Sequence, residues 1–131
     1  LTQDLARAQA EAAKLAQERA GRGADGRTWP HGEELAPDDA NFDLTYGRVG
    51  AAFGPDEVGS HARSASPFGV EDLAGNVWEW TVSRHDASQV ITRGGSWYQG
   101  AATAMLANRE PSERTHRDPL LGVRVCATAE W

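Results

Sequence analysis

The sequence predicts a loop-rich domain that combines one N-terminal helix with a few short strands. Residues 1–20 contain no glycine or proline and place leucine and alanine at the 4-3-4-3 spacing of an amphipathic helix. The rest of the chain is rich in glycine, proline, aspartate and asparagine and contains short β-favouring runs. Five tryptophans and 14 glycines against two tyrosines are typical of an irregular fold whose few large side chains carry the core. We therefore expect a helix over 1–22 and a second unit over 23–131.

The expected elements have identifiable ends. Gly21, Gly23 and Gly26 should stop the helix, with Arg19 and Arg22 near its negative C-terminal end. The best strand candidates are 77–82, 90–93 and 122–126. In the last of these, Val123 and Val125 would face one way and Arg124 and Cys126 the other.

Composition excludes several classes of protein. A chain of 131 residues is long enough for one domain with a real core. Its 13 basic and 19 acidic residues give a net charge of −6, so we expect no nucleic-acid partner and no membrane surface. Cys126 is the single cysteine, which excludes an internal disulfide and a cysteine-cage zinc site. The sequence has no signal-like segment, which leaves the compartment open and favours the cytoplasm.

One segment carries most of the chemical information. Residues 72–80 read Asp-Leu-Ala-Gly-Asn-Val-Trp-Glu-Trp, with two carboxylates flanking a turn and a Trp-x-Trp pair. Calcium binds to carboxylates and backbone carbonyls that converge from one irregular loop, and Asp72 and Glu79 could supply the carboxylates. The alternative is that the acidic residues are turn formers and solvated charges. The spacing differs from that of an EF-hand loop.

Several motifs resemble those of one family, in the same order and at similar intervals. They are Gly75-Asn-Val-Trp-Glu-Trp80, Arg93-Gly-Gly-Ser-Trp97, Asn108-Arg109, Arg117-Asp118 and Gly122-Val-Arg-Val125. The series, over roughly residues 16–126, is similar to that of the formylglycine-generating enzyme family, also called sulfatase-modifying-factor domains. The resemblance implies a single α+β domain related to C-type lectins, with low regular secondary structure and bound calcium.

The resemblance also assigns metal ligands. One family calcium site falls on the side chains of Asp72 and Glu79 and on the carbonyls of Gly75 and Val77. A second begins on Asn41 and the carbonyl of Phe42, and its acidic partner has no clear counterpart in 47–53.

The family's oxidase chemistry depends on two cysteines just after the Gly-Gly-Ser-aromatic motif, which bind copper and the substrate's cysteine. The corresponding residues here are Gln99 and Ala104. Soft thiolates hold Cu(I), and neither residue replaces them. We therefore expect no copper and no formylglycine generation.

A polar stretch after the Gly-Gly-Ser-Trp motif has the chemistry of a recognition surface, with aromatic faces, an amide and guanidinium groups. The candidate ligand-binding residues are Trp97, Tyr98, Gln99, Asn108, Arg109, His116 and Arg117. The stretch 108–118 lacks strand alternation. The alternative for Arg109, Arg117 and Asp118 is a buried ion network that holds a long loop. His31 is interpreted as a loop residue, and His61 and His85 have no partner at ligand spacing.

Three functional hypotheses follow. The first is a non-catalytic, calcium-stabilised module that binds a protein or small-molecule ligand, as variable proteins of diversity-generating retroelements do. The second is an enzyme of the wider family, such as part of an iron-dependent sulfoxide synthase, with a substrate groove near Trp97–Gln99. The third is formylglycine generation. The family domain is longer and the chain begins on Leu1, so we expect the C-terminal portion of a larger, bacterial protein. An N-terminal half or another chain of that protein would be a partner.

Overall fold

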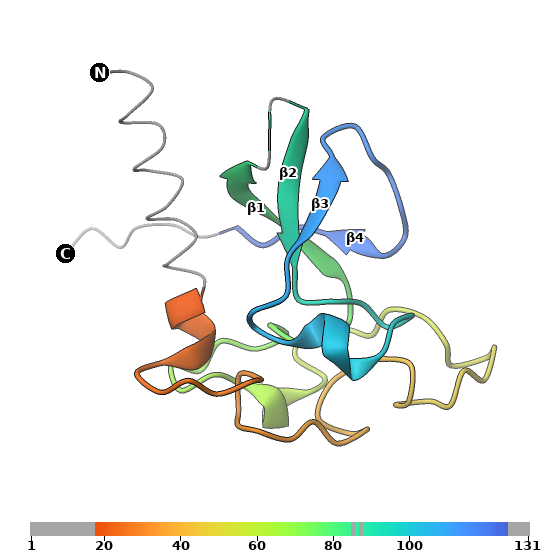
Figure 1. The fold of residues 1–131 in the computed structure, drawn as a ribbon. Coiled ribbons are helices and arrows are strands. Elements are labelled where there is room, and N and C mark those ends of the chain that lie inside the picture. The colour runs from red at the N-terminus through yellow and green to blue at the C-terminus, as the bar shows by residue number, and fades with distance from the viewer. Residues whose placement is uncertain (1–17, 85, 87, 126–131) are drawn as a thin grey trace.

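A four-stranded sheet is the main regular element of the computed structural model, which describes residues 18–84, 86 and 88–125 (Figure 1). The strands are β1 (Trp78–Arg84), β2 (Gln89–Arg93), β3 (Glu110–Glu113) and β4 (Leu121–Gly122), in the order β3-β2-β1-β4. Two short 3-10 helices, η1 (Ala62–Ser64) and η2 (Ala101–Ala104), lie among the loops. The described part is therefore an α+β arrangement with little regular secondary structure, as the sequence predicts.

The sheet is mixed. β1 pairs antiparallel with β2 and places Glu79 opposite Arg93, while β2 pairs antiparallel with β3. β4 is parallel to β1 and pairs Glu79 with Gly122. Because β4 comes back beside β1 from the far end of the chain, the 72–80 motif lies against the segment after β4.

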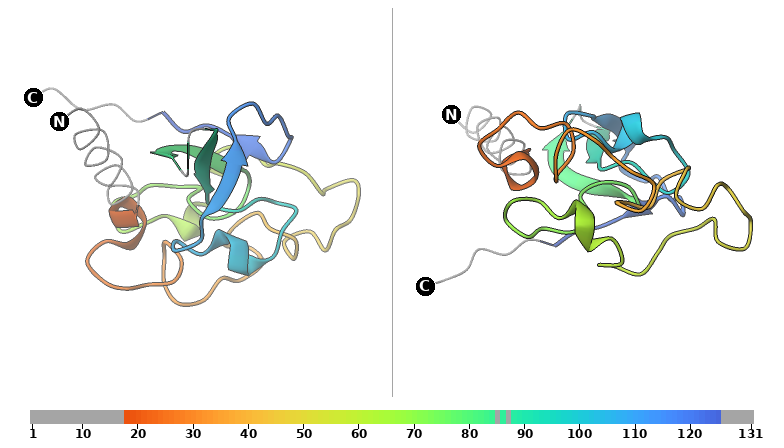
Figure 2. Two further views of the ribbon diagram at one scale, coloured as in Figure 1. Left: turned by 45° about the horizontal axis from the view of Figure 1, so that its top comes forward. Right: turned by 90° about the horizontal axis from the view of Figure 1, so that it is seen from below.

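The loops before β1 gather at one end of the sheet together with η2 (Figures 1 and 2). Gly75 permits a close approach of two loops in this region. Gly75 has φ +74, and a Cβ on it would lie 2.3 Å from the carbonyl oxygen of Asn41. The two residues form an isolated parallel bridge, and the Asn76 N–H donates to the Asn41 carbonyl over 2.7 Å. A side chain at position 75 would therefore break the contact between the two loops.

The buried core of the loop layer is small. Ala40, Phe42, Ala74 and Ala104 form it, and Trp29, Leu35 and Ala101 pack against it. The indole Nε1 of Trp29 donates to the Ala101 carbonyl over 3.3 Å. Burying small side chains yields little hydrophobic free energy per residue, so buried polar contacts have to hold much of this layer.

The N-terminal helix is described over residues 18–22, and the rest of the predicted 1–22 helix lies outside the described residues. It ends at Gly23, which has φ +67 and donates its N–H to the Arg19 carbonyl over 3.0 Å. This left-handed C-cap confirms one predicted stop. Gly21 is buried within the helix, where an added Cβ would lie 2.3 Å from Leu106 Cδ2. The described helix therefore packs closely on the domain through its glycine.

The predicted strands 77–82 and 90–93 are confirmed within about two residues by β1 and β2. The prediction for 122–126 is wrong in extent, because β4 ends at Gly122 and the described residues 123–125 are not in a strand. Arg124 there turns its side chain to partners on another loop. Cys126 lies outside the described residues.

The stretch 108–118 lacks apolar alternation in the sequence, yet it contains β3. β3 is an edge strand and includes Pro111, a residue that sheets accept at their edges. Backbone pairing with β2 therefore forms this strand without an apolar alternation. Within the described residues, no helix has the length and apolar character needed to cross a bilayer.

Candidate functional site

An aromatic cluster lies on the loop that follows β2. The ring of Phe53 meets Trp97 edge-on at 4.7 Å and lies 5.6 Å from Tyr98, and Trp97 and Tyr98 are 5.8 Å apart. The Arg48 guanidinium lies 5.7 Å from the centre of the Tyr98 ring and donates to Asp43 over 3.0 Å. Tyr98 remains 50% exposed, so the cluster offers an aromatic face and a cation to solvent. Phe53 and Arg48, from a distant loop, had no sequence motif that marked them.

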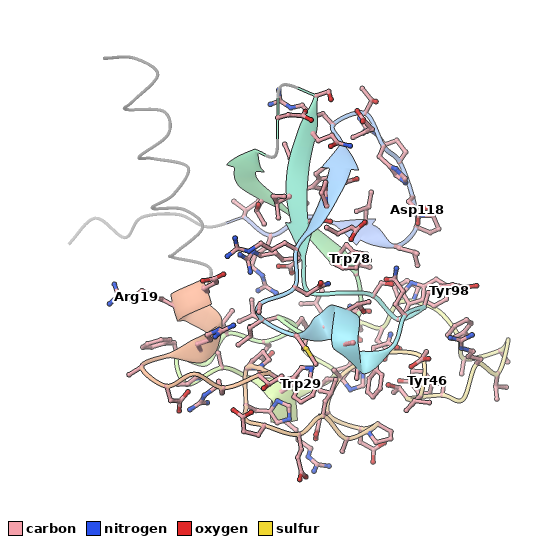
Figure 3. The ribbon with its side chains drawn as sticks, viewed as in Figure 1. Arg19, Trp29, Tyr46, Trp78, Tyr98 and Asp118 are labelled. Atoms are coloured by element: carbon pink, nitrogen blue, oxygen red, sulfur yellow. The ribbon has the colours of Figure 1, made fainter. Side chains whose placement is uncertain are left out.

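Gln99 comes from the same turn but faces the interior. Its side-chain oxygen accepts the Trp78 indole N–H over 2.6 Å and the Ser96 hydroxyl over 2.7 Å. Its carbonyl accepts the Asp43 N–H over 3.1 Å. Figure 3 shows Trp78 between the sheet and the loops that carry Tyr98. Gln99 therefore fixes the turn that presents Trp97 and Tyr98.

Ala104 is 1% exposed and belongs to the loop core. The family resemblance places the cysteine pair at Gln99 and Ala104. The side-chain oxygen of Gln99 already accepts two hydrogen bonds inside the domain, and the Ala104 methyl group is buried. Neither side chain can form a thiolate.

The first predicted metal site is a cavity of about 230 Å³ beside β1 and β4. All four predicted ligands, Asp72, Gly75, Val77 and Glu79, line it. The other lining residues are Val58, Asn76, Val123 and Arg124. The sequence motif therefore folds into one concave site, with β1 supplying Glu79 and the turn before it supplying Asp72.

The electrostatics of this cavity are unbalanced. Asp72 is 8% exposed at φ +57, and its Oδ2 accepts the Gly59 N–H over 2.7 Å. Burial raises the pKa of Glu79, the Arg124 guanidinium partly offsets this, and the charge of Asp72 raises the pKa further. Two carboxylates thus share a partly dry site with one guanidinium.

This donor set fits a hard cation. Two carboxylates and the backbone of one irregular loop are the oxygen donors that calcium accepts. Among the described residues, no three His, Cys, Asp or Glu side chains lie close enough to hold a metal together. A cation in this cavity would therefore need backbone carbonyl or water oxygens in addition to Asp72 and Glu79.

The second predicted metal site contains a structural asparagine. The Asn41 amide nitrogen donates to the Gly54 carbonyl over 2.8 Å and to Asn76 Oδ1 over 3.3 Å. Phe42 is 2% exposed in the loop core. The Asp56 N–H donates to the same Asn76 oxygen, so the loop brings Asp56 near this position. Asp56 lies just beyond the 47–53 window in which the sequence indicates no acidic partner.

The carboxylate of Asp56 already has partners. Its Oδ2 accepts the Tyr46 hydroxyl over 2.7 Å and lies 2.7 Å from His61 Nε2. The hydrogen bond to Asp56 raises the pKa of Tyr46. His61 thus has a partner five residues away that ligand spacing did not indicate. His31 lies in a turn and pairs with Asp39 at 3.2 Å, as expected of a loop residue.

The other predicted ligand-binding residues lie in two further places. Arg109 and Arg93 both pair with Glu18 of the N-terminal helix, Arg93 over 3.0 Å. Burial acts to raise the pKa of Glu18, but hydrogen bonds and charge from the two arginines outweigh it and lower the pKa. Burial lowers the pKa of Arg93. Asn108 donates its amide to the Thr103 carbonyl over 2.9 Å.

His116 and Arg117 lie in the exposed loop between β3 and β4, marked by Asp118 in Figure 3. His116 is 3.6 Å from Asp118, and Arg117 donates to the carbonyl of His116 over 2.9 Å. The proposed buried network of Arg109, Arg117 and Asp118 is therefore wrong. Arg109 belongs to the network with Glu18 instead, because the fold brings the N-terminal helix and not the β3–β4 loop to it.

Residues 10–129 match the family described as the Sulfatase-modifying factor enzyme 1-like domain. Inactive C-alpha-formylglycine-generating enzyme 2 of Bos taurus is 33% identical over 89 residues, which cover 60% of this chain and 29% of that protein. The chain thus spans less than a third of this curated relative.

Solved structures are similar in fold. Treponema denticola variable protein 1 has a TM-score of 0.66 at 22% identity, covering 85% of this chain and 44% of its own. PvdO from Pseudomonas aeruginosa has a TM-score of 0.68 at 22% identity, and the match covers 85% of this chain and 49% of PvdO. CarF has a TM-score of 0.68 at 18% identity, and the match covers 83% of this chain and 43% of CarF. The chain therefore spans less than half of each of these proteins.

Proposed function

Because the chain belongs to the Sulfatase-modifying factor enzyme 1-like domain family, we propose that it uses the family fold as a calcium-stabilised binding module without oxidase activity. The observation that carries the proposal is that the side chains of Gln99 and Ala104 both have structural roles inside the domain. One accepts two hydrogen bonds inside the domain and the other is 1% exposed. A copper-binding, cysteine-capturing pair needs two accessible thiolates at this place. The relative named inactive in Bos taurus agrees with this interpretation.

The binding surface that we propose is the aromatic cluster of Phe53, Trp97 and Tyr98 with Arg48. Rigid aromatic side chains offer a large contact area at a low entropic cost, and the nearby guanidinium adds directional hydrogen bonding. Exposed Leu44 (62%) and Val49 (59%) come from the same loop as Arg48 and Phe53. A protein or small-molecule ligand with an apolar or aromatic group and an acceptor oxygen suits this surface.

The proposed calcium would bind in the cavity lined by Asp72, Gly75, Val77 and Glu79. There it would supply two positive charges that join the turn before β1 to β1 itself. The ion would act structurally, since the aromatic cluster does not include these residues.

A selection with a displayed random-peptide library tests the binding function. Peptides that bind the intact protein should lose at least tenfold in affinity for Tyr98→Ala, because an exposed aromatic anchor contributes about 1–2 kcal/mol or more to such a contact. Phe68→Ala is the matched control, since Phe68 is an aromatic residue 67% exposed on another loop. Peptides that bind Tyr98→Ala as tightly as the wild type would refute this surface.

The same preparation tests the absence of oxidase activity. Copper loading followed by incubation with a cysteine-containing sulfatase peptide should yield no aldehyde, as read by mass spectrometry. Turnover beyond one aldehyde per protein would overturn the non-catalytic proposal.

A further inference from the structure

We propose that Arg124 is a built-in counter-ion of the Asp72–Glu79 cavity, which calcium has to displace from Glu79 in order to bind. The inference rests on the proposed calcium site and assigns a role to a residue outside its ligand set.

The contact geometry places the guanidinium where a cation would act on Glu79. Arg124 Nε lies 3.0 and 2.9 Å from the two Glu79 carboxylate oxygens, and its Nη2 lies 2.8 Å from Oε1. Nη2 also donates to the Glu71 carbonyl over 2.8 Å, next to Asp72. Both Glu79 oxygens are therefore engaged by Arg124, and a metal that takes Glu79 as a ligand competes with the guanidinium for this carboxylate.

Charge decides which cation prevails. Asp72 and Glu79 together carry two negative charges, and one guanidinium carries one positive charge. A divalent ion neutralises both carboxylates and binds their oxygens directly, whereas Arg124 leaves the site one charge short. Arg124 thus lowers calcium affinity without preventing binding.

The segment that carries Arg124 buries little apolar surface. It follows β4, a strand of two residues, and is not itself in a strand. Val123 and Val125 on either side are 74% and 86% exposed, so they bury little apolar surface here. Calcium binding should therefore loosen residues 121–125 while it tightens the turn before β1.

Isothermal titration of the intact protein with calcium chloride tests the inference. Arg124→Gln removes the competing charge and should bind calcium about tenfold more tightly than the wild type. Arg114→Gln is the matched control, because Arg114 is exposed just after β3 and its loss changes the net charge equally. This control should bind calcium as the wild type does.

The outcomes separate this inference from the proposed function. Wild-type binding with equal or weaker binding by Arg124→Gln would overturn the counter-ion role and leave the calcium site intact. Absence of binding in both proteins would refute the calcium site and the inference with it.

Hydrogen exchange of the wild type gives a second readout that does not depend on how the variant folds. Calcium should speed amide exchange in 121–125 and slow it in 72–77. Slower exchange in both segments would overturn the displacement.

Discussion

Glu79 and Arg93 stand opposite each other in the β1–β2 ladder, yet each has its ion-pair partner in a remote part of the chain. Arg93 pairs with Glu18 from the N-terminal helix, and Glu79 pairs with Arg124 after β4. The two clusters have opposite imbalances. In the first, two guanidiniums share one carboxylate, whereas in the second two carboxylates share one guanidinium.

The difference shows how local charge balance separates a structural site from a cation site. The two arginines lower the pKa of Glu18 against the effect of burial, so the chain itself neutralises this carboxylate. Burial and Asp72 raise the pKa of Glu79 despite Arg124, so its cluster gains from a further positive charge. Three predictions test this contrast.

Arg93→Ala should have the largest effect, a loss of about 3 kcal/mol in the free energy of unfolding measured with urea. The Arg93 side chain is 6% exposed and donates to Glu18 and, over 2.7 Å, to the Leu106 carbonyl. Arg109→Ala is the control, because this side chain is 34% exposed and its loss should cost only about 1 kcal/mol. Equal losses in the two variants would contradict the view that the buried arginine holds the helix.

Calcium binding at the Asp72–Glu79 cluster should change the free energy of unfolding by nearly as much as Arg93→Ala does. A calcium concentration 100-fold above the dissociation constant should raise the unfolding free energy of the wild type by about 2.7 kcal/mol relative to EDTA. Asp72→Asn should reduce this gain, because it removes one of the two carboxylate charges, while its unfolding free energy in EDTA should equal or slightly exceed that of the wild type. Asparagine tolerates the positive φ, keeps an oxygen for the Gly59 N–H and removes the repulsion with Glu79.

An unchanged melting temperature on chelation of the wild type would refute calcium stabilisation. A strong destabilisation of Asp72→Asn in EDTA would show that the carboxylate is needed for folding without a cation.

Acid should produce the smallest of the three effects. The folded pKa of Glu18 is below its ordinary value, so the ionised carboxylate stabilises the protein above about pH 4.5. This contribution is lost as the pH falls through the lowered pKa. The difference in unfolding free energy between the wild type and Glu18→Gln should therefore shrink from pH 6 to pH 3. A difference that stays constant with pH would argue against an ionic role for Glu18.

The sequence predicted the parts whose signal is local. The strand runs around Trp78 and Val90 and the helix stop at Gly23 follow from side-chain type and backbone preference over a few residues. The four candidate ligands of the first metal site also come from one short turn-and-strand segment, and the fold keeps them in one cavity.

Non-local pairing was missed. β3 is formed by backbone hydrogen bonds to β2 and has no apolar alternation that a sequence pattern could reveal. Pro111 and Glu113 fit there because β3 lies at the edge of the sheet. Arg109 and Arg117 are eight positions apart in the sequence, but one pairs with the helix and the other lies on an exposed loop. Residue type alone therefore grouped side chains that the fold separates.

The sequence by itself determined the family, the presence of Gln99 and Ala104 after the Gly-Gly-Ser-Trp motif and the place of the acidic turn, because these depend on which residues are present and in what order. Tertiary structure alone decided that Gln99 faces Trp78, that Phe53 and Arg48 complete the aromatic cluster, and that Arg124 rests on Glu79. These contacts join residues 21 to 50 positions apart, and the packing of loops against the sheet, not any local preference, selects them.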